Sequence, residues 1–240
     1  MTASWAERIL IIGGTSGIGL AAAQLLTERG AHVTVTGRDP ARAAAAGNTL
    51  GEHGDAVSVD AGDRDAVEDL FHTLGPLDHL VVAASGGSGA GPFRDLNLTD
   101  LRSGFDGKLW PQLIAVSAAL PRLRPDGSIT LITAISAQSA EPGTSGLAAI
   151  NGALEAMIPT LAVELAPLRV NAVSPGVIDT TWWDFLPADQ RAATFDSYAR
   201  RTPAGRVGQP ADVADAIAFL IGNTFTTGVV LACDGGLHLA

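Results

Sequence analysis

Three glycines near the amino terminus have the spacing of a phosphate-binding turn. Gly13, Gly17 and Gly19 lie between an apolar run, residues 9–12, and an alanine- and leucine-rich stretch that begins at Leu20. This order predicts a strand, a tight turn and a helix. Glycine lets the backbone approach a ligand closely, and the start of a helix favours an anion. The spacing Gly-x-x-x-Gly-x-Gly is a variant of the dinucleotide fingerprint. The residues expected to hold a pyrophosphate are Gly13, Thr15, Ser16, Gly17, Ile18 and Gly19.

The tip of the next predicted strand selects between dinucleotides. An acidic side chain there would bind the ribose 2′-hydroxyl of NAD, but the residue is Gly37. Arg38 follows, and its planar guanidinium suits a 2′-phosphate. We therefore expect NADP as the cofactor, with NAD as the second choice. A surface ion pair is the alternative for Arg38.

Further cofactor contacts are expected where the third, fourth and sixth strands end. After the third strand, Asp60 either accepts from the adenine amino group or serves as an ordinary turn carboxylate. Small side chains end the fourth strand and let a ribose pack against backbone. After the sixth strand, backbone groups and the Thr180 hydroxyl are placed to hold a carboxamide. The predicted contacts are Asp60, Ala61, Ala83, Ala84, Ser85, Pro175, Gly176, Ile178 and Thr180.

Short apolar runs alternate with helical stretches along the whole chain, which predicts a parallel sheet with helices on both faces. The expected strands are residues 9–12, 32–36, 56–59, 79–83, 128–133, 169–173 and 229–232. The expected helices lie near 17–29, 40–50, 63–74, 99–123, 145–166 and 210–221. No linker or repeat divides the chain, so residues 1–240 are predicted to form one doubly wound α/β domain.

Local signals refine this frame. Asp39 before Pro40 predicts a capped helix start, and Thr99 is the expected cap of the long helix that follows it. Residues 178–203 are less regular and are interpreted as a mobile flap beside the cleft. Packing helices with no gating role are the alternative for this segment.

Composition narrows the classes of partner. The net charge is −10 with no cluster of basic residues, which argues against nucleic acid and anionic membrane surfaces. Cys233 is the single cysteine, so no internal disulfide framework is possible. The amino terminus has no signal-type apolar core, and no uncharged run is long enough to span a membrane. We expect a cytoplasmic protein that acts on a small molecule.

Several segments together resemble the short-chain dehydrogenase/reductase family over essentially the whole length. They are the glycine turn, Asp60, the small residues at 83–86, the stretch 169–176 and the closing Asp234-Gly235-Gly236. The resemblance implies a Rossmann-type, three-layer fold with a seven-stranded sheet. It also implies a nicotinamide cofactor, and a homo-oligomer (tetramer or dimer) built on the helices near 99–123 and 145–166.

The resemblance also implies a Ser-Tyr-Lys-Asn constellation that this chain lacks. Ala134 occupies the serine position, Leu147 the tyrosine position, Asn151 the lysine position and Lys108 the asparagine position. No other alignment restores a Tyr-x-x-x-Lys sequence, because Tyr198 is the only tyrosine and Lys108 the only lysine.

Lysine and asparagine have exchanged helices, so we expect Lys108 to point toward Asn151 and the nicotinamide ribose. The alternative is a lysine that extends to solvent or an interface. Ser136 or Ser139 could replace the missing serine hydroxyl, although loop hydrogen bonds also explain them. No spacing of histidines and carboxylates indicates a metal.

The predicted function is an NADP(H)-dependent oxidoreductase for a small carbonyl or alcohol, with Lys108, Ser136 and Asn151 as catalytic candidates. Two alternatives stay open. One is a catalytically silent dinucleotide-binding protein or partner subunit, and the other is a lyase or isomerase on the same fold.

Overall fold

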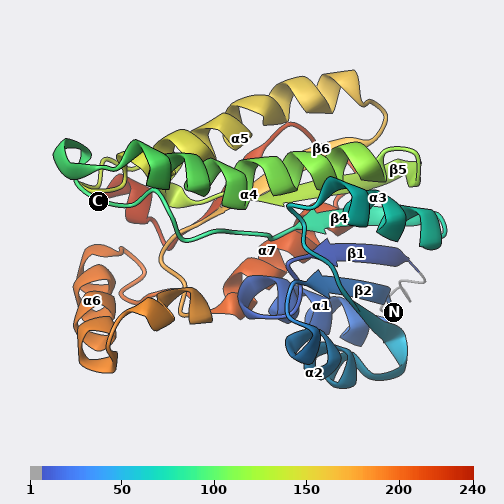
Figure 1. Ribbon diagram of the computed structural model, residues 1–240, viewed down its shortest axis with the longest axis horizontal. Helices are drawn as coiled ribbons and strands as arrows, with labels where there is room; N and C mark the ends of the chain where they lie inside the picture. Colours follow the sequence, from blue (N-terminus) through green and yellow to red (C-terminus); the bar gives the residue numbers. More distant parts are fainter. Residues whose placement is uncertain (1–6) are drawn as a thin grey trace.

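The structure, a computed structural model, describes residues 7–240, and its strands form one parallel sheet in the order β3-β2-β1-β4-β5-β6-β7 (Figure 1). The strands are β1 (Arg8–Ile12), β2 (His32–Gly37), β3 (Gly54–Ser58), β4 (Leu77–Val82), β5 (Leu123–Ile132), β6 (Arg169–Pro175) and β7 (Val230–Cys233). The strand order reverses between β1 and β4, so the crevice for a ligand lies at the carboxyl ends of these two strands. The predicted doubly wound α/β fold is confirmed.

Helices cover both faces of the sheet and make the three layers that were predicted. The helices are α1 (Gly17–Glu28), α2 (Pro40–Leu50), α3 (Arg64–Thr73), α4 (Leu98–Ala119), α5 (Ser145–Glu164), α6 (Ala188–Arg201) and α7 (Pro210–Gly222). One face carries α1, α2 and α7, and the opposite face carries α3, α4 and α5 (Figure 1).

Strand β1 shows why its sequence is apolar at every position. Ile9 and Ile11 pack with Leu26 of α1 in one core cluster. Leu10 and Ile12 point to the other face and join the cluster beneath α3, α4 and α5. Both faces of the strand are covered, as parallel sheets require.

Of the two predicted helix caps, the structure confirms one and replaces the other with a different residue. The Asp39 side chain accepts hydrogen bonds from two amides of the first turn of α2, which confirms that cap. The prediction for Thr99 is wrong. Helix α4 begins at Leu98, and Asn97 caps it by accepting from the Thr99 amide at 2.8 Å. An asparagine side chain fits a cap at least as well as threonine.

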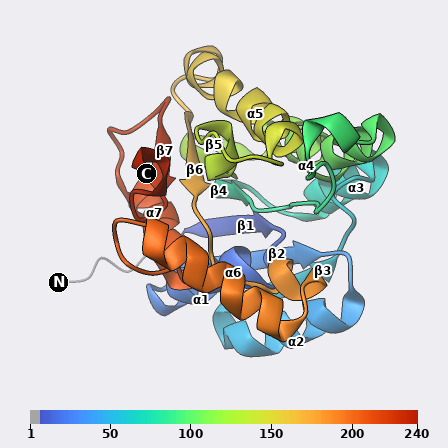
Figure 2. The ribbon, with the colours of Figure 1, turned by 90° about the vertical axis from the view of Figure 1, so that its left-hand side faces the viewer.

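The segment expected to be irregular is partly helical. A 3-10 turn, η4 (Thr181–Phe185), precedes the 14-residue helix α6, so the prediction of irregular chain is wrong for residues 188–201. Figure 2 shows α6 in front of the sheet when the molecule is viewed from that end. Residues 178–203, η4 and α6 with their short connections, are called the flap below; the name refers to position and implies no motion.

One helix among the described residues, α5, is long and apolar enough to cross a membrane by length and composition alone. The core helix of a globular protein passes the same test. Helix α5 packs against β6, α4 and the 3-10 turn η3 (Ile135–Ala137). One face of α5, which includes Ile150, Leu154 and Ile158, is buried in these contacts.

Candidate functional site

The glycine turn between β1 and α1 holds backbone at unusually close range. A Cβ on Gly19 would lie 2.2 Å from the Gly13 carbonyl oxygen, and one on Gly13 would lie 2.7 Å from the Ala84 amide nitrogen. Gly13 also has a φ of +80°, a left-handed conformation that favours glycine. The amides of Gly13 and Gly14 both donate to the Thr36 carbonyl, which ties the turn to β2. The turn is therefore a fixed cradle that a side chain would fill.

The start of α1 leaves amides available at this cradle. Ser16 is the N-cap residue, but its side chain makes no capping hydrogen bond. The first amides of a helix have no partner within the helix, so those of residues 17–19 are free to meet an anion. Thr15 packs against Gly37 of β2, where a Cβ would lie 2.3 Å from its hydroxyl oxygen. The cradle therefore fits a pyrophosphate.

Arg38 follows β2 at the rim of the same edge and is exposed. Among residues 7–240, no carboxylate forms an ion pair with its guanidinium, in contrast to Arg42, which lies 3.8 Å from Asp39. The surface ion pair that we considered for Arg38 is thus not seen. Asp60 accepts from the Gly62 amide at 3.0 Å, the turn role that was its alternative. Ala61 beside it is buried.

The ends of β4 and β6 complete this edge. Ala83 donates its amide to the Ile12 carbonyl, and the Ala84 carbonyl accepts from Gln112 of α4. Ser85 is exposed and donates only to the neighbouring Gly86 carbonyl. Ala83 and Ala84 are half-buried, and their role as a surface for the cofactor ribose stays a prediction.

On the β6 side, the Gly176 amide donates to the Cys233 carbonyl after Pro175, and Ile178 is buried. Thr180 faces the glycine turn, since a Cβ on Gly17 would lie 3.4 Å from its methyl carbon. Its hydroxyl oxygen accepts from the Trp182 amide and keeps a hydrogen to donate.

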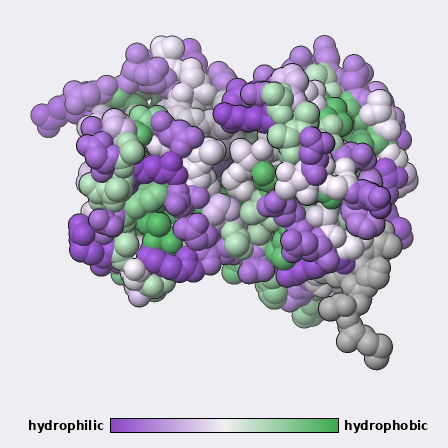
Figure 3. Space-filling model, turned by 90° about the horizontal axis from the view of Figure 1, so that it is seen from below, coloured by the Kyte–Doolittle hydropathy of each residue, from purple (hydrophilic) through white to green (hydrophobic). Residues whose placement is uncertain are grey.

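The flap contributes an aromatic wall to the crevice. The Trp182 indole donates to the Gly86 carbonyl at 3.4 Å, which connects the flap to the loop after β4. Trp182 packs edge-on against both Trp183 and Phe185. Figure 3 shows the surface hollowed between the side that carries α6 and the side that carries α1 and α2.

Lys108 lies inside the molecule, on the face of α4 that meets β5. The residue is 8% exposed, and its ammonium donates to the Thr133 carbonyl at 3.0 Å. Burial lowers the pKa of Lys108 to about 8, while the negative charge of Glu155 acts in the opposite direction. We expected Lys108 to point toward Asn151, with extension to solvent as the alternative. The structure shows neither, because the lysine is buried and its hydrogen bond goes to Thr133.

Ser136 and Asn151 form a buried, hydrogen-bonded pair. The Asn151 side-chain amide donates to the Ser136 hydroxyl at 3.0 Å and to the Leu147 carbonyl at 2.9 Å. The Leu147 carbonyl can only accept, so it fixes which end of the amide is the nitrogen. The Asn151 carbonyl oxygen is buried and has no hydrogen-bond partner among residues 7–240. Such an orphan acceptor is costly unless a ligand supplies a donor.

The positions implied for serine and tyrosine hold no proton donor. Ala134 and Leu147 are half-buried and apolar. Tyr198 lies on α6 against Trp183 and Arg201. Burial, together with the nearby Glu141, raises the pKa of Tyr198, which makes it a weaker acid.

Sequence reasoning missed Glu155, which is linked to the buried lysine through Thr133. The Thr133 hydroxyl donates to Glu155 at 2.8 Å, and Gln138 donates to its other oxygen at 3.0 Å. The available signal was its spacing, because residues four apart on a helix share a face and Glu155 follows Asn151 by four.

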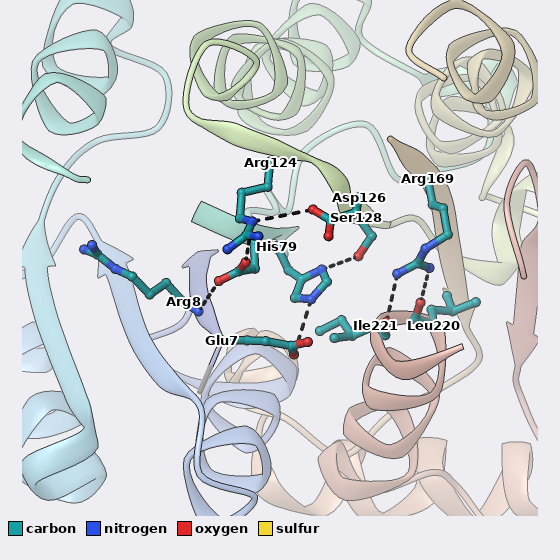
Figure 4. A network of polar contacts seen from close by, with 10 residues as sticks. Glu7, Arg8, His79, Arg124, Asp126, Ser128, Arg169, Leu220 and Ile221 are labelled. Atoms are coloured by element: carbon teal, nitrogen blue, oxygen red, sulfur yellow. Dashed lines mark hydrogen bonds and ion pairs between the residues drawn. The ribbon is translucent and has the colours of Figure 1, made fainter. Parts of the chain in front are cut away.

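A second polar network lies at the amino ends of the strands, away from the crevice (Figure 4). His79 contacts the Ser128 hydroxyl at 2.8 Å and Glu7 at 3.3 Å. Ser128 is fully buried, so this arrangement offers no nucleophile to a substrate. Nearby, Arg169 donates to the Leu220 and Ile221 carbonyls near the end of α7. Within residues 7–240, no group of three or more potential ligands is placed to hold a metal ion.

Comparison with known proteins gives the family. A sequence model of the family described as Enoyl-(Acyl carrier protein) reductase matches residues 13–238. The short-chain dehydrogenase/reductase malC of Malbranchea aurantiaca is 32% identical, over 97% of this chain and 95% of its own. The chain belongs to the short-chain dehydrogenase/reductase family.

Two further relatives are similar to this short-chain dehydrogenase/reductase over nearly the whole length of both chains. The cis-4-hydroxycyclohexanecarboxylate dehydrogenase of Sinomonas cyclohexanicum is 34% identical, with 98% of each chain covered. A solved structure of a small-chain dehydrogenase in complex with NADPH has a TM-score of 0.84 and 34% identity, and the match covers 98% of this chain and 99% of that one.

Proposed function

We propose that this family member is an NADP(H)-dependent oxidoreductase that acts on a small carbonyl or alcohol without the usual tyrosine. The observation that carries the proposal is the glycine cradle between β1 and α1, with uncapped amides and the unpaired Arg38 at its rim. A solved relative with NADPH bound supports the choice of cofactor.

When bound, the cofactor would supply or accept a hydride, so that carbonyl reduction needs only a proton from the protein. The turn around Gly13 and Gly19 would hold the pyrophosphate, and Arg38 the 2′-phosphate. Thr180 and the backbone after β6 would hold the carboxamide. Trp182 would shield this end of the crevice from water, which strengthens electrostatic contacts inside it.

In this proposal, Ser136 binds the substrate oxygen. Asn151 donates to the Ser136 hydroxyl oxygen, so the hydroxyl hydrogen is free to point at a carbonyl. Lys108 would provide the proton, because an acid with a pKa near the working pH transfers protons efficiently. The unpartnered Asn151 oxygen would accept from a ligand hydroxyl.

A silent dinucleotide-binding protein is the second candidate. It is favoured by the apolar Ala134 and Leu147 and by the unsuitable environment of Tyr198. Titration with NADPH, followed by a panel of ketones and aldehydes read at the nicotinamide absorbance, separates the two. We expect saturable binding and consumption with at least one carbonyl. Binding without consumption across the panel would support the second candidate, and absence of binding would contradict both.

The variant Arg38→Ala tests the choice of dinucleotide. Loss of a charge-assisted, two-pronged contact with the 2′-phosphate should raise the Kd for NADPH about tenfold or more. The Kd for NADH should stay nearly unchanged, as should both values in the control Arg64→Ala on α3. Fluorescence titration of both cofactors provides the measurement. Equal weakening of NADPH and NADH would show that Arg38 does not read the phosphate.

A further inference from the structure

The only lysine of the chain is buried within a polar group that connects α4, β5 and α5. Its ammonium donates to the backbone carbonyl of Thr133, whose side-chain hydroxyl donates to Glu155. Glu155 is half-buried, and Gln138, which is exposed, holds its second oxygen. Thr133 is therefore in contact with the cation on one side and with the carboxylate on the other.

Glu155 is the charged group that acts on Lys108, whereas the other charged groups on the neighbouring elements are exposed or distant. Arg124 and Asp126 lie toward the amino end of β5 (Figure 4), and Asp78 is the second residue of β4, whereas Lys108 contacts the chain after the carboxyl end of β5. The charged side chains of α3 are exposed. On α4 itself, Arg102 and Asp106 are exposed as well. Glu164 is exposed at the far end of α5. Glu155 is the group whose charge acts on Lys108.

We propose that Glu155 is a positioning residue of this site, which acts through Thr133 to hold a negative charge beside Lys108 and so keeps the buried amine protonated. A buried ammonium without a counter-charge is strongly disfavoured. Thr133 fixes the carboxylate near the lysine, and Gln138 fixes its other oxygen at the surface. The proposal concerns the charge of Lys108, and its catalytic consequence rests on the proposed function.

In consequence, the protonation of Lys108 on α4 depends on Glu155 on α5. With Glu155 present, Lys108 is mostly protonated at neutral pH, since the pKa of the buried amine is about 8. Removal of the carboxylate takes away the influence that raises this pKa. The pKa of Lys108 would then fall, and a larger share of the side chain would be the neutral amine at neutral pH. A neutral amine cannot serve as the acid.

A single lysine allows a direct test. Protein labelled with ¹³C and ¹⁵N only at lysine gives the side-chain resonances of Lys108 alone, and their pH titration reports its protonation without cofactor or substrate. We expect the native midpoint near 8. In Glu155→Gln the midpoint should fall by about one pH unit. The control Glu164→Gln, an exposed carboxylate on the same helix, should leave it in place.

Thr133→Val keeps the carbonyl that accepts from Lys108 and removes the hydroxyl that donates to Glu155. We expect a smaller fall in the same direction. If Glu155→Gln does not fold, the titration midpoint of Thr133→Val alone tests the inference. A midpoint that is unchanged in Glu155→Gln, or in Thr133→Val when only that variant folds, would overturn the inference. NADPH consumption by the native enzyme is measured separately, so failure of the proposed function and failure of this inference can be told apart.

Discussion

Gly19→Ala should weaken NADPH binding severely, with Kd raised about a hundredfold or more. The added Cβ would meet the Gly13 carbonyl oxygen at 2.2 Å, so the turn must move. The neighbouring Cα of Gly14 lies at 2.9 Å and blocks relief in that direction. Displaced amides at the start of α1 can no longer converge on a pyrophosphate. Fluorescence titration with NADPH measures the loss, and circular dichroism shows whether the variant is folded.

A matched glycine provides the control for this variant. Gly152 lies inside α5, and a Cβ there would meet nothing within 4 Å. Gly152→Ala should therefore bind NADPH normally and gain up to about 1 kcal/mol in free energy of unfolding, because alanine favours helix over glycine. If folded Gly19→Ala binds NADPH as the native protein does, the pyrophosphate does not rest on this turn.

Lys108→Met should lower the rate of carbonyl reduction about a hundredfold or more while NADPH still binds. Methionine fills a similar volume, but it can neither donate to the Thr133 carbonyl nor supply a proton. Single-turnover oxidation of NADPH with the best carbonyl substrate of the panel gives the rate. An unchanged rate would remove Lys108 from the mechanism.

The same variant tests how deeply the lysine is desolvated. The pKa of Lys108 is lowered from 10.5 to about 8 in the folded protein, so the unfolded chain binds more protons between these values. The cost of burying the charged Lys108 ammonium lowers the free energy of unfolding fully below pH 8, and this cost disappears as the pH rises past 10.5. Native protein should therefore gain about 3 kcal/mol of unfolding free energy relative to Lys108→Met across this window. Denaturant unfolding at both ends of the window measures the difference, and a constant difference would mean that the amine is hydrated.

The layers, the strands and the tight glycine turn were predictable because each depends on a local sequence pattern. The apolar run at 9–12 has two buried faces, and the glycine spacing needs backbone approach at one turn. Helix α6 was not recognised because it has no buried residue and therefore no apolar stripe. Its contacts include Trp183 against Phe195, and Arg191 against Asp179 and Asp184, which only the folded chain brings together.

The candidate catalytic residues show the limit of position-by-position transfer from a family. Exchange of lysine and asparagine between two helices predicted that Lys108 and Asn151 would meet. In the structure each has another partner: Lys108 donates to the Thr133 carbonyl, and Asn151 donates to the Ser136 hydroxyl. Glu155, whose negative charge raises the pKa of Lys108, matches none of the four family positions.

The most direct test of the central claim uses NADPH that carries deuterium at the transferable position of its nicotinamide, together with the carbonyl panel and mass spectrometry of the products. The account predicts that native protein places one deuterium on the carbonyl carbon of an alcohol product, and that Ser136→Ala binds NADPH equally well but forms this product far more slowly. NADPH that binds at the cradle yet transfers deuterium to no member of the panel would contradict the claim that this chain is an oxidoreductase of small carbonyl compounds.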